Sequence, residues 1–150
     1  MDHPSRSPEQ PGQTLMLMAR DFQRRLDRDL LQRGVAGISA RQRAVLLCLG
    51  RFGASRAVDL ADAVDIRPQS MMKIVHELES LGLVERRADP MDSRAKLIDF
   101  TGRGRQLIEE LSRATGTVWQ QYAKILGKRN LEQTFAHLNT ILQAGETWVD

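Results

Sequence analysis

One side of a short segment carries five side chains that helical spacing would turn outward: Gln69, Ser70, Met72, Lys73 and His76. A glutamine amide can form two hydrogen bonds with the edge of an adenine, and a serine hydroxyl can donate to a phosphate. A lysine ammonium group can bind a phosphate or a guanine. This set of side chains therefore suits contact with a nucleic acid.

The segment that holds these residues is predicted to be a helix with one buried face. Pro68 fits the first position of a helix, and Gly82 is suited to end it. Arg67 stands where a capping Ser, Thr or Asp would be usual, so the helix requires capping from elsewhere. The predicted buried face consists of Met71, Ile74, Val75, Leu78 and Leu81.

Two short runs of alternating character, 83–87 and 96–100, follow this helix and predict a β-hairpin with a polar tip at 88–94. Arg94 ends the tip and is the strongest single candidate for a DNA contact. Asp92 cannot attract phosphate, so we expect it to accept hydrogen bonds from Arg94 or from amides of the turn. An ordinary Asp/Arg turn is the alternative interpretation of this pair.

A helix followed by a basic hairpin is typical of a winged helix-turn-helix. The major groove of B-DNA admits a helix, and the neighbouring minor groove admits a slim loop that ends in arginine. Arg86 and Arg87 are neighbours on one predicted strand and must point to opposite faces, so at most one of them readily faces DNA. Arg86 and Lys96 complete the candidate contacts.

The chain has 150 residues, a net charge of +3 and a calculated pI near 9.5, which together indicate one domain with a real core. A modest net charge with a local basic patch favours a specific nucleic-acid surface over a polybasic tail. The alternative interpretation is that these basic side chains are ordinary solvated surface charges. The basic residues concentrate in and just after the central stretch: Arg67, Lys73, Arg86, Arg87, Arg94, Lys96, Arg103 and Arg105.

Three helices are predicted before this central stretch. The first runs from a cap at Thr14 to near Gly34, and the second follows a capping box that opens at Ser39 and ends at Gly53. A third, short helix at 57–64 forms the helix-turn-helix pair with the helix described above.

Two further helices are predicted after the hairpin. Thr101 caps a long helix that Gly127 ends, and a last helix starts near Asn130. The last helix carries a heptad-like apolar stripe, which is typical of helix pairing. That stripe includes Leu131, Phe135, Leu138 and Leu142.

Three runs of residues follow one another in and after the hairpin: Gly82-Leu83-Val84-Glu85-Arg86-Arg87, Asp89-Pro90-Met91-Asp92-Ser93-Arg94 and Phe100-Thr101-Gly102-Arg103-Gly104. They closely resemble the wing signature of the multiple-antibiotic-resistance regulator (MarR) family. The resemblance to that family extends over nearly the whole chain, from about residue 14 to 148. The resemblance implies a mainly α-helical winged helix-turn-helix with a small β-hairpin wing, and terminal helices that pair two chains. Family members commonly carry a small hydroxyl residue at the position of Met72 and an arginine at that of Lys73, so the preferred DNA sequence is open.

The resemblance also implies an organisation and a function. We expect a flexible tail at 1–13 and a single domain at 14–150, in which a DNA-binding lobe at about 38–102 lies between dimerisation helices at about 14–34 and 103–150. The expected protein is a cytoplasmic homodimer that binds a pseudo-palindromic double-stranded operator. Its two recognition helices would enter successive major grooves and the Arg94 side chains the minor grooves. Repression is the default expectation.

Related regulators bind phenolic or aromatic effectors, so a small aromatic effector is a possible partner. Five residues are candidates for lining its cavity: Met16, Met18, Phe22, Trp119 and Tyr122. Aromatic and methionine side chains at helical spacing are more often part of a core.

Other classes of function have less support. No enzyme motif, metal-ligand spacing or cofactor motif is present, so we expect no enzyme, no metal and no cofactor. No signal peptide or apolar run long enough for a membrane helix is found. One alternative is a winged-helix module that binds a protein, which the acidic residues Glu77, Glu79 and Glu85 keep open. Another is a regulator that senses oxidants through Cys48, although a cysteine in an apolar run is usually inert.

Overall fold

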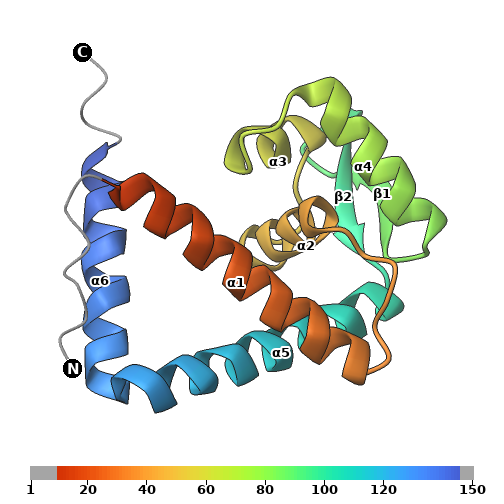
Figure 1. Ribbon diagram of the computed structural model, residues 1–150. Helices are drawn as coiled ribbons and strands as arrows, with labels where there is room; N and C mark the ends of the chain where they lie inside the picture. The colour runs from red at the N-terminus through yellow and green to blue at the C-terminus, as the bar shows by residue number, and fades with distance from the viewer. Residues whose placement is uncertain (1–9, 146–150) are drawn as a thin grey trace, which may run out of the picture.

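The computed structural model describes residues 10–145, which form six helices and one antiparallel hairpin (Figure 1). Residues 40–100 form a lobe, and the first helix and the last two helices lie beside it. The elements in chain order are α1 (Pro11–Gln32), α2 (Ala40–Phe52), α3 (Ala57–Ala63), α4 (Pro68–Ser80), β1 (Val84–Asp89), β2 (Asp92–Phe100), α5 (Gly102–Leu126) and α6 (Lys128–Gly145).

The central lobe is formed by α2, α3, α4 and the hairpin. Ser39 and Gln42 form the predicted capping box at the start of α2, and Gly53 ends that helix with a φ of 78°. Asp65 adopts a φ of 51° in the turn between α3 and α4, a conformation that aspartate tolerates better than most residues. Buried side chains from all of these elements meet in one core: Val45, Leu46, Leu49, Leu60, Met71, Val75, Leu78, Val84 and Ile98.

The hairpin is a wing that projects beside α4 (Figure 1). Val84 lies opposite Phe100, the pairing continues to Ala88 opposite Lys96, and an irregularity then places Asp89 opposite Asp92. The strands therefore extend further than predicted, and the turn is reduced to Pro90 and Met91. Arg94 lies within β2 rather than in a loop, because the wing pairs almost to its tip.

The outer helices are α1, α5 and α6, and they lie at sharp angles to one another beside the lobe (Figure 1). Helix α5 runs along the base of the lobe, and α6 leads away from the end of α5. Polar contacts fasten α1 to α5: the Tyr122 hydroxyl donates to Asp21 at 2.8 Å, and Arg25 Nη1 donates to Gln121 at 3.0 Å. The rings of Trp119 and Phe135 meet edge to face at 4.8 Å between centroids, which joins α6 to α5.

Several predicted boundaries shift by a few residues. The first helix begins at Pro11 rather than at Thr14, because proline fits the first turn, so residues 11–13 of the predicted tail are helical. The rest of that tail, residues 1–9, lies outside the described range, as do residues 146–150 of the predicted domain. The last helix begins at Lys128, two residues before Asn130.

Two apolar side chains near helix ends are exposed, and one of them was predicted to be buried. Leu81 follows the last turn of α4 and is 36% exposed, although it was predicted to lie on the buried face. Leu126, at the end of α5, is 47% exposed, because the helix extends past the lobe by that point. None of the helices between residues 10 and 145 is long and apolar enough to cross a membrane.

Candidate nucleic-acid interface

The outward face of α4 is polar and largely unoccupied by the rest of the chain. Pro68 starts the helix, and no side chain caps it at Arg67, as predicted. Met72 is half-buried, whereas Gln69, Ser70 and Lys73 are exposed. Within residues 10–145, the side chains of Gln69, Ser70 and Lys73 form no hydrogen bond or ion pair. They are therefore available to an external partner.

The wing places a second set of available groups beside this face. The side chains of Arg94 and Lys96 are exposed on β2 and have no polar partner in the described part of the chain. Asp92 Oδ1 accepts a hydrogen bond from the backbone N–H of Arg94 at 3.0 Å. This contact agrees with the expected positioning role of Asp92, through a turn amide rather than through the guanidinium.

Arg86 points back toward α4 rather than outward. Its Nε lies 2.8 Å from Glu79 Oε1, and its Nη2 lies 3.2 Å from His76 Nδ1. His76 itself is exposed, so it presents an imidazole at the edge of the polar face. Arg87, on the other face of β1, pairs across the hairpin with Asp99 at 2.9 Å. Both arginines are thus engaged within the wing and α4, whereas the sequence analysis allowed at most one to face DNA and named Arg86 as the candidate.

An ion pair that the sequence analysis missed joins the wing to the helix-turn-helix. Arg56, just before α3, donates from Nη2 and Nε to Asp89 Oδ2 at 2.7 and 3.0 Å. Asp89 is buried near the wing tip, and its other oxygen accepts the N–H of Met91 at 2.9 Å. Local sequence gave no signal for this pair, because the two residues are 33 positions apart.

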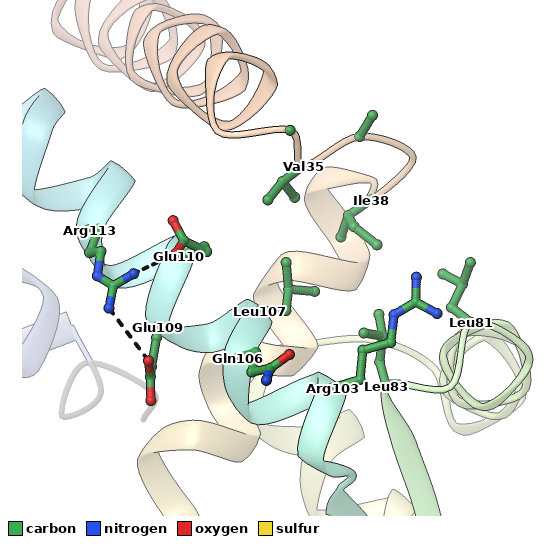
Figure 2. A pocket seen from close by; sticks show the side chains of 12 residues that line it. Val35, Ile38, Leu81, Leu83, Arg103, Gln106, Leu107, Glu109, Glu110 and Arg113 are labelled. Carbon is green, nitrogen blue, oxygen red and sulfur yellow. Dashed lines mark hydrogen bonds and ion pairs between the residues drawn. The ribbon is translucent and has the colours of Figure 1, made fainter.

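A groove runs between the loop that follows α1, the end of α4 and the first half of α5 (Figure 2). Its volume is about 530 Å³. Leu83 and Leu107 contribute apolar surface, and Arg103 contributes a cation that has no polar partner among the described residues. Arg113 is neutralised in place by Glu109 and Glu110, as the dashed lines in Figure 2 show.

The groove contains none of the five residues predicted to line an effector cavity. Met16 and Met18 are exposed on α1, and Phe22 packs against Tyr122 with 6.4 Å between ring centroids. Trp119 is used in the contact with α6. Burial, together with the hydrogen bond to Asp21, raises the pKa of Tyr122 to about 12, so its hydroxyl stays protonated and engaged. Phe22, Trp119 and Tyr122 thus stabilise the packing of the outer helices, whereas Met16 and Met18 do not.

Comparison with known proteins agrees with this geometry. Residues 36–95, which include α2, α3, α4 and most of the wing, match the model of the MarR family. The match covers less than half of the chain. An uncharacterised HTH-type transcriptional regulator of Mycobacterium bovis is 32% identical to this chain over 91 residues, which cover 60% of the chain and 64% of the relative. The matched part therefore spans less than two thirds of that relative.

Solved structures show the same fold. Apo MarR from E. coli aligns with a TM-score of 0.71 and 22% identity, covering 88% of this chain and 96% of that one. A variant of MepR from S. aureus, bound to an oligodeoxyribonucleotide, aligns with a TM-score of 0.59 and 21% identity, covering 89% and 96% of the two chains. The mainly helical fold with a two-stranded wing is thus confirmed.

The predicted dimerisation stripe of α6 has a buried part and an exposed part. Leu131 is 2% exposed and Phe135 is half-buried, because both pack against their own chain. Leu131 is therefore corrected to a core residue. Leu138 is intermediate, whereas Leu142 is 70% exposed and its neighbour Ile141 is 67% exposed.

Cys48 lies in the core of the lobe, and burial raises the pKa of its thiol. The thiolate, which is the reactive form, is thus disfavoured. Between residues 10 and 145, no group of three or more His, Cys, Asp and Glu side chains is arranged to hold a metal ion.

We predict that Cys48 reacts slowly with a thiol reagent such as DTNB in the native protein, and fully in guanidinium chloride. Peroxide treatment is expected to leave binding to any ligand unchanged, and Cys48→Ser is expected to behave in the same way as the wild type. Rapid labelling of the native protein, or a peroxide effect that Cys48→Ser removes, would instead support the oxidant-sensing alternative.

Proposed function

We propose that this protein is a cytoplasmic transcriptional regulator that binds a specific double-stranded DNA site through α4 and the wing. The observation that carries the proposal is the pairing of an unoccupied polar helix face with a free arginine on the adjacent wing. Gln69, Ser70 and Lys73 are free to reach bases or phosphates in a major groove. Arg94 is free to enter a narrow minor groove, where the negative potential is strongest.

The names of similar proteins support this proposal. The M. bovis relative is named as an HTH-type transcriptional regulator, and the MepR variant was crystallised with an oligodeoxyribonucleotide. The fold shared with that variant supports a DNA-binding role for the same lobe in this chain.

The proposal is tested by titrating the protein against labelled duplexes from the DNA that flanks its own coding region, in the presence of unlabelled competitor. Several phosphate contacts per dimer make the affinity fall steeply as salt rises, on the order of 10³-fold between 50 and 200 mM. Equal, weak binding to every duplex, after a genome-wide search for sites, would contradict the proposal.

That contrary outcome would favour the protein-interaction module. The acidic residues that kept this alternative open in the sequence analysis support it less once the structure is considered. Glu77 accepts a hydrogen bond from Gln42 at 2.8 Å, and Glu79 pairs with Arg86. Two of the three carboxylates are thus engaged within the chain, and only Glu85 lacks such a partner among the described residues.

We also propose that the protein acts as a homodimer through its outer helices. Large apolar side chains are exposed at the start of α1, at the end of α5 and on the second half of α6. Large apolar side chains that gather on a protein surface often mark an interaction site. A two-fold dimer would place two α4 helices in successive major grooves, about 34 Å apart, on a pseudo-palindromic operator. The exposed residues are Leu15, Met16, Leu17, Met18, Ile125, Leu126, Ile141 and Leu142.

We predict that the double substitution Ile141→Glu and Leu142→Glu produces a folded monomer, because two carboxylates would be desolvated in the interface. Light scattering coupled to size exclusion measures the mass of the species. The matched control replaces two exposed glutamines of the same helix, Gln133→Glu and Gln143→Glu, and is expected to stay dimeric. An unchanged dimer in the first variant would exclude this part of α6 from the interface.

We propose that a small-molecule effector binds in the groove beside Arg103. Its binding would release the protein from an operator that it represses. The groove offers apolar walls and one free cation, which suits a small aromatic carboxylate. It also lies between the lobe and α5, so an occupant would bias the angle between them. The check adds benzoate, with benzamide as the uncharged control, to the protein–DNA complex. Release of DNA by benzoate alone supports the site if Arg103→Ala abolishes it; equal release from that variant contradicts it.

A further inference from the structure

Two neighbouring residues ahead of α3 fasten the wing at two separate places. Ser55 forms a backbone bridge with Ile98 of β2, in which each N–H donates to the carbonyl of the other residue, at 3.1 and 2.8 Å. Arg56, the next residue, forms its ion pair with Asp89 near the tip. The wing is thus held at its middle by backbone and further out by one side chain.

Without the attachment at Asp89, the part of the wing beyond the Ser55–Ile98 bridge would be held at one end only. Ile98 lies opposite Arg86, whereas Asp89 is three residues nearer the tip. At about 3.3 Å per residue, that stretch extends about 10 Å beyond the backbone bridge. A two-stranded hairpin is only marginally stable by itself in water. An attachment at Asp89 therefore restricts a part of the chain that would otherwise move.

The surroundings of Asp89 favour a well-ordered attachment. The Asp89 carboxylate is 8% exposed, so its attraction to the guanidinium is screened less than that of a surface ion pair. The N–H of Met91 and the guanidinium of Arg56 both lower the pKa of Asp89, which keeps the pair charged at neutral pH. Arg56 Nη2 also lies 3.8 Å from Asp92, the residue whose carboxylate accepts the N–H of Arg94.

We propose that Arg56 and Asp89 are positioning residues that hold the wing, and with it Arg94, at the angle required for the minor groove. This inference rests on the proposed DNA-binding function. Arg56 acts through Asp89 and Asp92 on the segment that carries Arg94, so neither Arg56 nor Asp89 needs to touch DNA. The term wing latch is used below for the Arg56–Asp89 pair.

The variant Asp89→Asn distinguishes the effect of the wing latch on DNA affinity from the effect of the Asp89 charge alone. Removal of a negative charge close to DNA would, by charge alone, make binding tighter. Loss of the wing latch would make binding weaker, because ordering the wing would then oppose association. We expect an affinity about tenfold weaker, the change that corresponds to one charge-assisted hydrogen bond of ordinary strength.

The decisive measurement is a double-mutant cycle on the full-length protein. The dissociation constant for the operator is measured for Arg56→Ala and Asp89→Asn, each alone and combined with Arg94→Ala. Each change is expected to weaken binding about tenfold beside Arg94 and less than about twofold once Arg94 is absent, because the two sites are coupled. Arg56→Lys is expected to retain part of the affinity. The control Asp62→Asn removes an exposed carboxylate of α3 that forms no side-chain hydrogen bond or ion pair among the described residues.

Hydrogen exchange in the absence of DNA supplies a second reading. The amides of Met91 and Arg94 are expected to exchange faster in both latch variants than in the wild type, while the core of α4 stays protected. Unchanged exchange, tighter binding by Asp89→Asn, or equal losses with and without Arg94 would overturn the inference. If the wild type itself fails to select a DNA site, the proposed function fails, and the exchange data still judge whether the wing latch orders the tip.

Discussion

Arg94→Ala is expected to lower operator affinity about 100-fold, with little change in the stability of the free protein. Arg94 is exposed and has no polar partner among the described residues, so its truncation leaves no unpaired group behind. A guanidinium in a narrow minor groove contributes about 1.4 kcal/mol for each wing, within the range of arginine contacts to DNA. A dimer has two wings, and their losses combine.

The measurement is a fluorescence-anisotropy titration at fixed salt, repeated on operators whose flanking segments are A·T-rich or G·C-rich. The wild type is expected to prefer A·T-rich flanks, whose minor groove is narrower, and Arg94→Ala is expected to lose that preference. Arg129→Ala removes an exposed charge of α6 and serves as the control for net charge. If both variants lose affinity equally, the wing makes no specific contact and the arginine contributes only to the general field.

Gly104→Ala is expected to destabilise the protein by about 3 kcal/mol, at the upper end of the usual cost of overpacking. A methyl group at this position would lie 1.9 Å from the carbonyl oxygen of Leu83 and 3.0 Å from the ring of Phe100. That carbonyl cannot move freely, because it accepts the N–H of Thr101 at 3.1 Å. The substitution therefore forces apart the base of the wing and the start of α5.

The matched control is Gly116→Ala in the same helix. An added methyl group there meets no described atom within 4 Å, and glycine is a weak helix former. The control is therefore expected to stabilise the protein by about 0.5–1 kcal/mol. Thermal melts of the two variants should shift in opposite directions, with Gly104→Ala lower by roughly 6–12 °C. A melt of Gly104→Ala close to that of the wild type would mean that α5 and the wing separate at small cost.

Local patterns were sufficient to predict most elements of the fold. Each helix has a start or stop signal that acts over a few residues, such as the Ser39 capping box, the Thr101 cap and the glycines Gly53, Gly82 and Gly127. Thr101 accepts the N–H of Gly104 at 3.1 Å, as its position before the long helix predicted. The wing strands were predicted too short, because pairing of Ala88 with Lys96 depends on the partner strand and not on local alternation.

Long-range contacts account for what the sequence analysis missed. The wing latch joins Arg56 to Asp89, and the link from α2 to α4 joins Gln42 to Glu77, over separations that no periodic pattern covers. The effector candidates Phe22 and Tyr122 were chosen for their chemistry, but their positions follow from the packing of α1 on α5. The free polar residues of α4 were predictable, because helical spacing alone separates them from the buried ones.

The separation of the two faces of α4 has a consequence for how such proteins diversify. Met71, Val75 and Leu78 hold the helix in the core, whereas Gln69, Ser70 and Lys73 contribute nothing to that core. Substitutions at the second set therefore cost little stability, since exposed positions away from special features usually change it by less than about 0.5 kcal/mol. A duplicated copy of this gene could acquire a new target site by a few changes at these positions, while retaining the same folded scaffold.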